Sequence, residues 1–90
     1  MIIVAGYALR KTTEDRDASV AAFAEMVGRA RQQAGCIDMA ISADAINPTR
    51  SNIVEVWRDE KAWKAWRKIA RGPRSAAKEV HVSIYHVEKA

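Results

Sequence analysis

The order in which hydrophobic periodicity changes along the chain constrains the fold more than any other feature. Apolar residues recur with a period of two in some segments, as in strands, and of about 3.6 in others, as in amphipathic helices. We expect strands over residues 2–9, 36–43, 52–58 and 79–87, and helices that end at residue 34 and just before Gly72-Pro73. With right-handed crossovers, the first and third strands become neighbours and both helices share one face. The predicted fold class is α+β, a ferredoxin-like βαββαβ four-stranded antiparallel sheet.

Local signals place the ends of these helices. Thr13, Asp15 and Asp17 are candidate N-caps of the first helix, and Asp59 is the candidate N-cap of the second. In the strand over residues 36–43, strict alternation predicts that Ile37 shares a face with Met39, Ile41 and Ala43. The second helix is expected to bury one apolar arc, formed by Ala62, Trp63, Trp66, Ile69 and Ala70.

Length and composition limit the chain to a simple organisation. Ninety residues support one hydrophobic core, so we expect a single domain over residues 1–90. A lone cysteine, Cys36, excludes an intramolecular disulfide and a CxxC motif, and is interpreted as a structural thiol rather than a nucleophile. No apolar run approaches the roughly 20 residues of a membrane helix, and the N-terminal apolar stretch precedes its positive charges. The sequence therefore predicts a cytoplasmic protein without a membrane segment.

Both faces of the first predicted strand are apolar. A sheet covered by helices on one side usually has a polar opposite face, so this pattern indicates that a second copy covers it. We therefore predict a homodimer of face-to-face sheets, in which Val4 and Ala8 point into the partner and Val4→Lys weakens the dimer. The alternative is that the strand is apolar only because it is central.

Several kinds of chemistry lack the residues they need. The four glycines are too far apart for a dinucleotide or phosphate loop. The two histidines, His81 and His86, are five residues apart on the last predicted strand and so lie on opposite faces. We therefore expect no metal site in this chain.

Aromatic residues are the main remaining candidates for function. Trp57, Trp63 and Trp66 fall within ten positions, on a strand and the helix that follows it. They either fill a small core or line a pocket for a small molecule. Glu55 shares a strand face with Ile53 and Trp57, where its carboxylate would orient a ligand or pair with an arginine across the dimer.

Three segments in this order resemble one known family. MIIVAGYALRK, then QQAGCI, then NIVEVWRDEKAWKAW are similar to the antibiotic biosynthesis monooxygenase family of small dimeric α+β barrel proteins, and the likeness extends over nearly the whole chain. The resemblance implies a homodimer with an aromatic pocket in each subunit. It also implies oxidation of a quinol-like or polyphenolic aromatic substrate by molecular oxygen without metal, flavin or other cofactor, the substrate supplying electrons as its anion.

The resemblance also implies roles for individual residues. Trp57 matches a strand tryptophan linked to the family's chemistry, and Trp63 matches a pocket aromatic. Glu55 and Tyr7 are the candidates for orienting a phenolic hydroxyl or removing its proton. The expected catalytic residues are therefore Trp57, Glu55 and Tyr7. The expected substrate-binding residues are Trp63, Trp66 and Ile53.

Two departures from the family pattern qualify these roles. Ile53 stands where the actinorhodin-type oxygenase has an asparagine, which favours the alternative of a non-catalytic small-molecule-binding or stress-response protein of the same fold. The haem-degrading branch has an asparagine and a histidine where this chain has Tyr7 and Ala76. The tryptophan of that branch is retained as Trp66. We therefore expect no specific haem binding.

Positive charge is concentrated late in the chain. Residues 58–78 carry a formal charge of +6, within a chain of net charge +4. RNA-binding modules of similar topology carry an RNP1-like motif, which this sequence lacks, and a basic helix face is usually solvated. We predict no nucleic-acid partner, although Arg71 and Arg74 could attract an anionic substrate to the pocket mouth.

Overall fold

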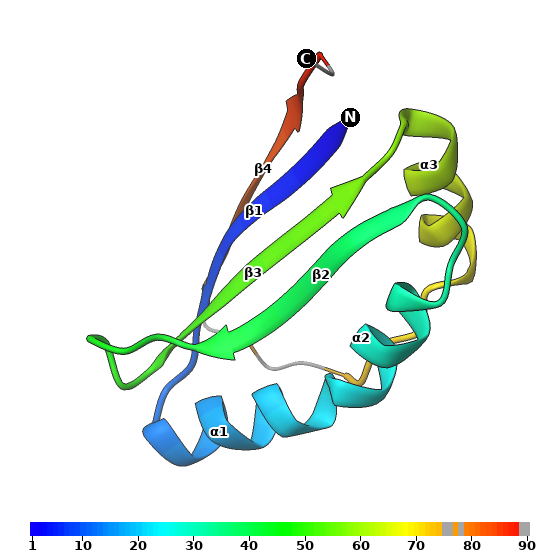
Figure 1. The fold of residues 1–90 in the computed structure, drawn as a ribbon. Helices are drawn as coiled ribbons and strands as arrows, with labels where there is room; N and C mark the ends of the chain where they lie inside the picture. The colour runs from blue at the N-terminus through cyan, green and yellow to red at the C-terminus, as the bar shows by residue number, and fades with distance from the viewer. Residues whose placement is uncertain (75–76, 78, 89–90) are drawn as a thin grey trace.

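The computed structural model describes residues 1–74, 77 and 79–88 and contains one antiparallel sheet with its helices on one side (Figure 1). The sheet order is β2-β3-β1-β4, so β1 and β3 are neighbours and the predicted ferredoxin-like α+β fold is confirmed. The elements in chain order are β1 (Ile2–Leu9), α1 (Thr13–Ala22), α2 (Ala24–Arg31), β2 (Cys36–Ala43), β3 (Arg50–Trp57), α3 (Glu60–Ile69) and β4 (Glu79–His86).

The helices differ from the sequence prediction at their ends. The first predicted helix is two helices, α1 and α2, that meet at Phe23. Thr12 is the N-cap of α1, because its side chain accepts a hydrogen bond from the Asp15 N–H at 3.0 Å. Asp59 caps α3 as predicted, accepting from the Ala62 N–H at 2.8 Å. The second helix was expected to end just before Gly72-Pro73 and to bury Ile69, and both expectations were wrong, because α3 ends at Ile69 and this side chain is 49% exposed.

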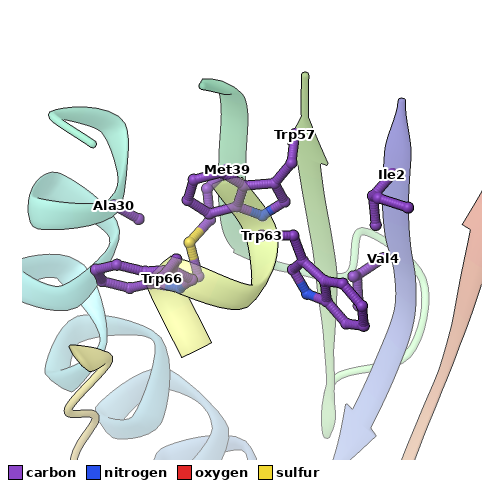
Figure 2. Packing of buried hydrophobic residues seen from close by; sticks show 7 residues of the cluster. All are labelled: Ile2, Val4, Ala30, Met39, Trp57, Trp63 and Trp66. Carbon is purple, nitrogen blue, oxygen red and sulfur yellow. The ribbon is translucent and has the colours of Figure 1, made fainter. Parts of the chain in front are cut away.

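The core lies between the sheet and the helices. Figure 2 shows Trp57, Trp63, Trp66 and Met39 together beside α3, with β1 on the other side of the cluster. Two β1 residues that we expected in a subunit interface, Val4 and Ala8, are only 7% and 2% exposed and lie on the helix-covered face, so that prediction was wrong. The outward apolar residues of β1 are Ile3, Ala5 and Leu9.

A bulge changes which β2 residues face the core. The register with β3 shifts between Cys36 and Asp38, so Ile37 has no partner in the ladder and is 58% exposed. Cys36 then packs with Met39 against the core. The expected alternation, which placed Ile37 on the same face as Met39, was therefore wrong at the start of this strand.

Two contacts, one polar and one steric, fix the loops around the sheet. Arg16 of α1 is buried, and its Nη1 donates to the backbone carbonyls of Asp44, Asn47 and Arg50 at 3.4, 3.3 and 3.1 Å. Gly35 has a φ of 85°, and a Cβ on it would lie 2.5 Å from the Ala62 Cβ. This turn therefore requires glycine, both for its left-handed backbone and for its contact with α3.

Candidate functional site

A cleft of two adjoining lobes lies between the helix-covered face of the sheet and the helices. We call it the inner cleft. The lobes have volumes of about 320 and 380 Å³, within the range of small-molecule sites, and both are mostly lined by apolar side chains. The residues common to both lobes are Val4, Met26, Met39, Glu55 and Val82.

Glu55 is the carboxylate of this cleft. It lies on β3, is half-buried, and is the only acidic residue among the described residues that line either lobe. The indole Nε1 of Trp57 donates to its Oε1 at 3.1 Å. No other side chain in the described part of the protein donates to this carboxylate, so Oε2 is left to accept from water or from a molecule in the cleft.

The three tryptophans have two different positions. Trp63 and Trp66 of α3 line the second lobe. Trp57 is fully buried, with 0% exposure, and does not line either lobe. Its ring stacks on Trp66, with centroids 6.1 Å apart and planes at 25°. Trp57 therefore lies behind the cleft and contacts two of the residues that line it, Glu55 and Trp66.

Ile53 and Tyr7, the two remaining expected site residues, lie on opposite faces of the sheet. Ile53 lines the first lobe, on the same face of β3 as Glu55. Tyr7 instead packs against His81, with ring centroids 5.0 Å apart and planes tilted by 31°, and the Arg50 guanidinium lies 4.1 Å from the centre of the Tyr7 ring. Because successive strand residues point to opposite faces, Tyr7 is separated from Glu55 by the sheet.

Cys36 has the environment of a structural thiol. It is half-buried and packs against the core. Burial raises the pKa of this thiol, and the carboxylates of Asp38 and Glu55 raise it further, while Arg31 opposes them. The thiol therefore stays protonated near neutral pH and is a poor nucleophile.

Arg67 belongs to the basic segment that was expected to face solvent, yet it is a cleft residue. It lines the second lobe, and its guanidinium lies 5.0 Å from the centre of the Trp63 ring. The i, i+4 spacing from Trp63 is the signal that could have found it. Arg71 and Arg74, which we placed at the pocket mouth, do not line either lobe.

Features linked to other functions are sparse in the described part of the chain. His81 pairs with Glu79 at 3.1 Å, and the described residues form no group of three or more side chains suited to hold a metal ion. Ala76, at the position of the haem branch's histidine, lies outside the described residues. None of the described helices has the length and apolar character needed to cross a membrane.

The fold and the inner cleft define a small ferredoxin-like protein that encloses space between its sheet and its helices. The sequence model for antibiotic biosynthesis monooxygenases matches residues 1–71, so the chain belongs to the antibiotic biosynthesis monooxygenase family. No curated protein matches the sequence.

Solved structures share this fold at low sequence identity. A protein from Nitrosomonas europaea assigned to the same family superimposes with a TM-score of 0.74 and 20% identity, covering 97% of this chain and 98% of its own. One from Deinococcus radiodurans gives a TM-score of 0.73 and 17% identity, over 100% and 95% of the two chains. The haem degrader MhuD of Mycobacterium tuberculosis, solved with two haems in its active site, gives 0.69 and 12%, over 100% and 98%.

Proposed function

We propose that this chain is a monooxygenase that binds a quinol-like or polyphenolic aromatic molecule in the inner cleft and oxidises it with molecular oxygen, without a cofactor. The observation that carries this proposal is the position of Glu55, a single half-buried carboxylate in an apolar cleft, held by the Trp57 indole at 3.1 Å. A lone polar group in an apolar wall gives a bound molecule one orientation.

The roles of the lining residues follow from their chemistry. Trp63, Trp66 and Ile53 provide apolar surface for an aromatic ring. Glu55 accepts the hydrogen bond of a phenolic or enolic hydroxyl and favours the anionic, electron-rich form of the substrate as the proton leaves. Trp57 acts as a positioning residue for Glu55. Tyr7, on the other face of the sheet, has no part in this arrangement.

The reaction balances without an external reductant. Oxidation of a quinol to a hydroxyquinone, or of a methylene group between two aromatic rings to a ketone, releases four electrons. Molecular oxygen takes all four, since one of its atoms enters the product and the other leaves as water. Deprotonation of the substrate precedes electron transfer to oxygen, and this first step is the one at which Glu55 acts.

A second candidate function rests on Ile53. This apolar side chain lines the cleft at the position where the resemblance to actinorhodin-type oxygenases implies an asparagine. A cleft without that polar group still binds an aromatic molecule but lacks one hydrogen-bond donor toward oxygen or the substrate carbonyl. Ile53 therefore favours a non-catalytic binding protein of the same fold.

We also propose that the protein is a homodimer joined through the open face of the sheet. Ile3, Ala5 and Leu9 of β1, together with Val54 and Val56 of β3, line that face and are half-buried in the single chain. Contiguous outward apolar residues of this kind mark interaction surfaces. A two-fold dimer would cover the same patch on both copies.

Oxygen consumption tests the enzymatic proposal directly. Protein treated with a chelator is mixed with a panel of quinols and anthrones, and dissolved oxygen is followed with an electrode in the presence and absence of catalase. We expect one oxygen molecule consumed per substrate, one atom of ¹⁸O₂ in each product molecule, and no oxygen returned by catalase. Glu55→Gln should lose most of the rate. Glu60→Gln, which changes an exposed carboxylate paired with Lys64, is the matched control.

Each result separates the candidate functions. Binding of the aromatic compounds without oxygen consumption would support the binding-protein alternative and overturn the monooxygenase. Oxygen returned by catalase would identify an oxidase that makes hydrogen peroxide. Equal rates for Glu55→Gln and Glu60→Gln would remove Glu55 from the reaction.

A further inference from the structure

We propose that the aromatic molecule bound in the inner cleft carries an anionic group such as a carboxylate, and that Arg67 binds this group. The inference deepens the proposed function and rests on it, because it concerns the same cleft. The second lobe of the cleft is lined by one acidic side chain, Glu55, and one basic side chain, Arg67. These lie beside the rings of Trp63 and Trp66.

Arg67 is held in place by an aromatic ring rather than by an acid. Its guanidinium lies 5.0 Å from the Trp63 ring centre, one helical turn away on α3. Stacking on the ring orients the planar guanidinium and leaves its N–H donors available for a carboxylate. A carboxylate can accept two of these donors in parallel, which fixes the direction of the bound molecule.

The charge of Arg67 is uncompensated within the described chain. Two neighbouring basic residues have acidic partners, Lys64 with Glu60 at 3.4 Å and Arg58 with Asp59 at 3.3 Å. No described acidic side chain forms an ion pair with Arg67. Lys68, the next residue of α3, and Arg71, just after the helix, add to the positive potential. An anionic ligand at this end of the lobe is therefore attracted.

Glu55 determines the orientation of the bound molecule in the cleft. Its carboxylate repels an anionic group and accepts a hydrogen bond from a hydroxyl. A molecule with an anionic group at one end and a hydroxyl at the other would match both charged residues in one orientation only. A neutral aromatic would satisfy Glu55 and leave Arg67 without a partner.

A matched pair of probes tests this inference. 6-Hydroxy-2-naphthoate and 2-naphthol share a fused ring and a hydroxyl, and only the first carries a carboxylate. Titration calorimetry at low ionic strength measures both affinities for the full chain. We expect the carboxylate to bind about fivefold more tightly, the value of a solvent-accessible ion pair, and we expect added salt to reduce this advantage.

Variants locate the contact. Arg67→Gln should remove the fivefold advantage and leave the affinity for 2-naphthol unchanged. Lys68→Gln removes the same charge from the next residue of α3, which does not line the cleft, and should keep most of the advantage. Glu55→Gln should weaken 2-naphthol binding in any case, which reports that the probe occupies the inner cleft.

The outcomes distinguish this inference from the proposed function. If neither probe binds, the proposed function fails and this inference fails with it. If both bind equally, or if Arg67→Gln and Lys68→Gln reduce the advantage equally, the cleft remains a binding site and only the recognition of an anionic group by Arg67 is overturned.

Discussion

Replacing Trp57 by phenylalanine tests how the core supports the cleft. The change removes part of a fully buried ring and the N–H that donates to Glu55 at 3.1 Å. It also alters the stacking on Trp66, 6.1 Å away. We expect both lost stability and a Glu55 side chain that is less well positioned.

The magnitude follows from two separate contributions. Shortening a buried aromatic ring costs about 1–3 kcal/mol, because the core around it relaxes only in part. Losing a hydrogen bond to a charged group adds about 1 kcal/mol, a value at the low end because half-buried Glu55 can regain water through the cleft. The total of about 2–4 kcal/mol is a large share of the roughly 5–13 kcal/mol available to a 90-residue domain.

Guanidinium denaturation at one fixed protein concentration measures this loss, because dimerisation would make stability depend on concentration. The matched variant is Glu55→Gln, whose amide oxygen still accepts from the Trp57 indole, so its unfolding free energy should change by less than about 1 kcal/mol. A double-mutant cycle combines Trp57→Phe with Glu55→Ala, which removes the acceptor, and we expect a coupling energy near 1 kcal/mol between the two positions. Affinity for 2-naphthol is measured on the same four proteins.

Two results would refute this reasoning. A loss below about 1 kcal/mol for Trp57→Phe would show that the ring is not needed to fill the core. An additive cycle would show that the hydrogen bond to Glu55 contributes nothing measurable. If stability falls while ligand affinity and turnover stay unchanged in the folded variant, Trp57 is a structural residue only.

Three further predictions concern assembly, a turn and a loop. Sedimentation should give a dimer that Val54→Lys, on the open face, converts to folded monomers of 10.0 kDa, whereas Val4→Lys should unfold the chain; a monomeric parent protein would contradict this. Gly35→Ala should cost at least about 1–2 kcal/mol in thermal unfolding, because of its left-handed backbone and the overlap with α3, and an unchanged melting temperature would disprove it. The backbone N–H of Asn47 is the main cause that lowers the pKa of Asp44 from 3.8 to about 2. The stability from Asp44 should be complete above about pH 4 and lost as the pH falls toward 2, so acid unfolding followed by circular dichroism should be less steep in Asp44→Ala; equal curves would contradict this.

Much of the site could be predicted from strand alternation. Residues two apart on a strand share a face, so the sequence alone places Ile53, Glu55 and Trp57 together. The i, i+3 spacing of Trp63 and Trp66 likewise places both on one side of α3. The structure has these residues at or directly behind the inner cleft, because local periodicity survives packing.

Other parts of the site depended on contacts between distant segments. Alternation separates Tyr7 from Val4 but cannot say which of two apolar faces the helices cover. Arg67 looked like part of a solvated basic face, and only the packing of α3 brings it to the cleft. Arg16 is a charged residue that strand and helix periodicity would leave in solvent, yet it is buried because the carbonyls of the β2–β3 loop need donors.

The sequence by itself determined the order of the strands and helical segments, the cap at Asp59, and which residues share a strand face everywhere except at the start of β2. These are local properties, fixed by side-chain period and backbone chemistry within a few residues. Only the tertiary structure decided that Val4 and Ala8 face inward, that a bulge exposes Ile37, and that Trp57 lies behind the cleft rather than in its wall. The physical reason is that both faces of β1 are apolar, so their hydrophobicity is nearly equal, and the choice between them depends on how the helices pack against the sheet.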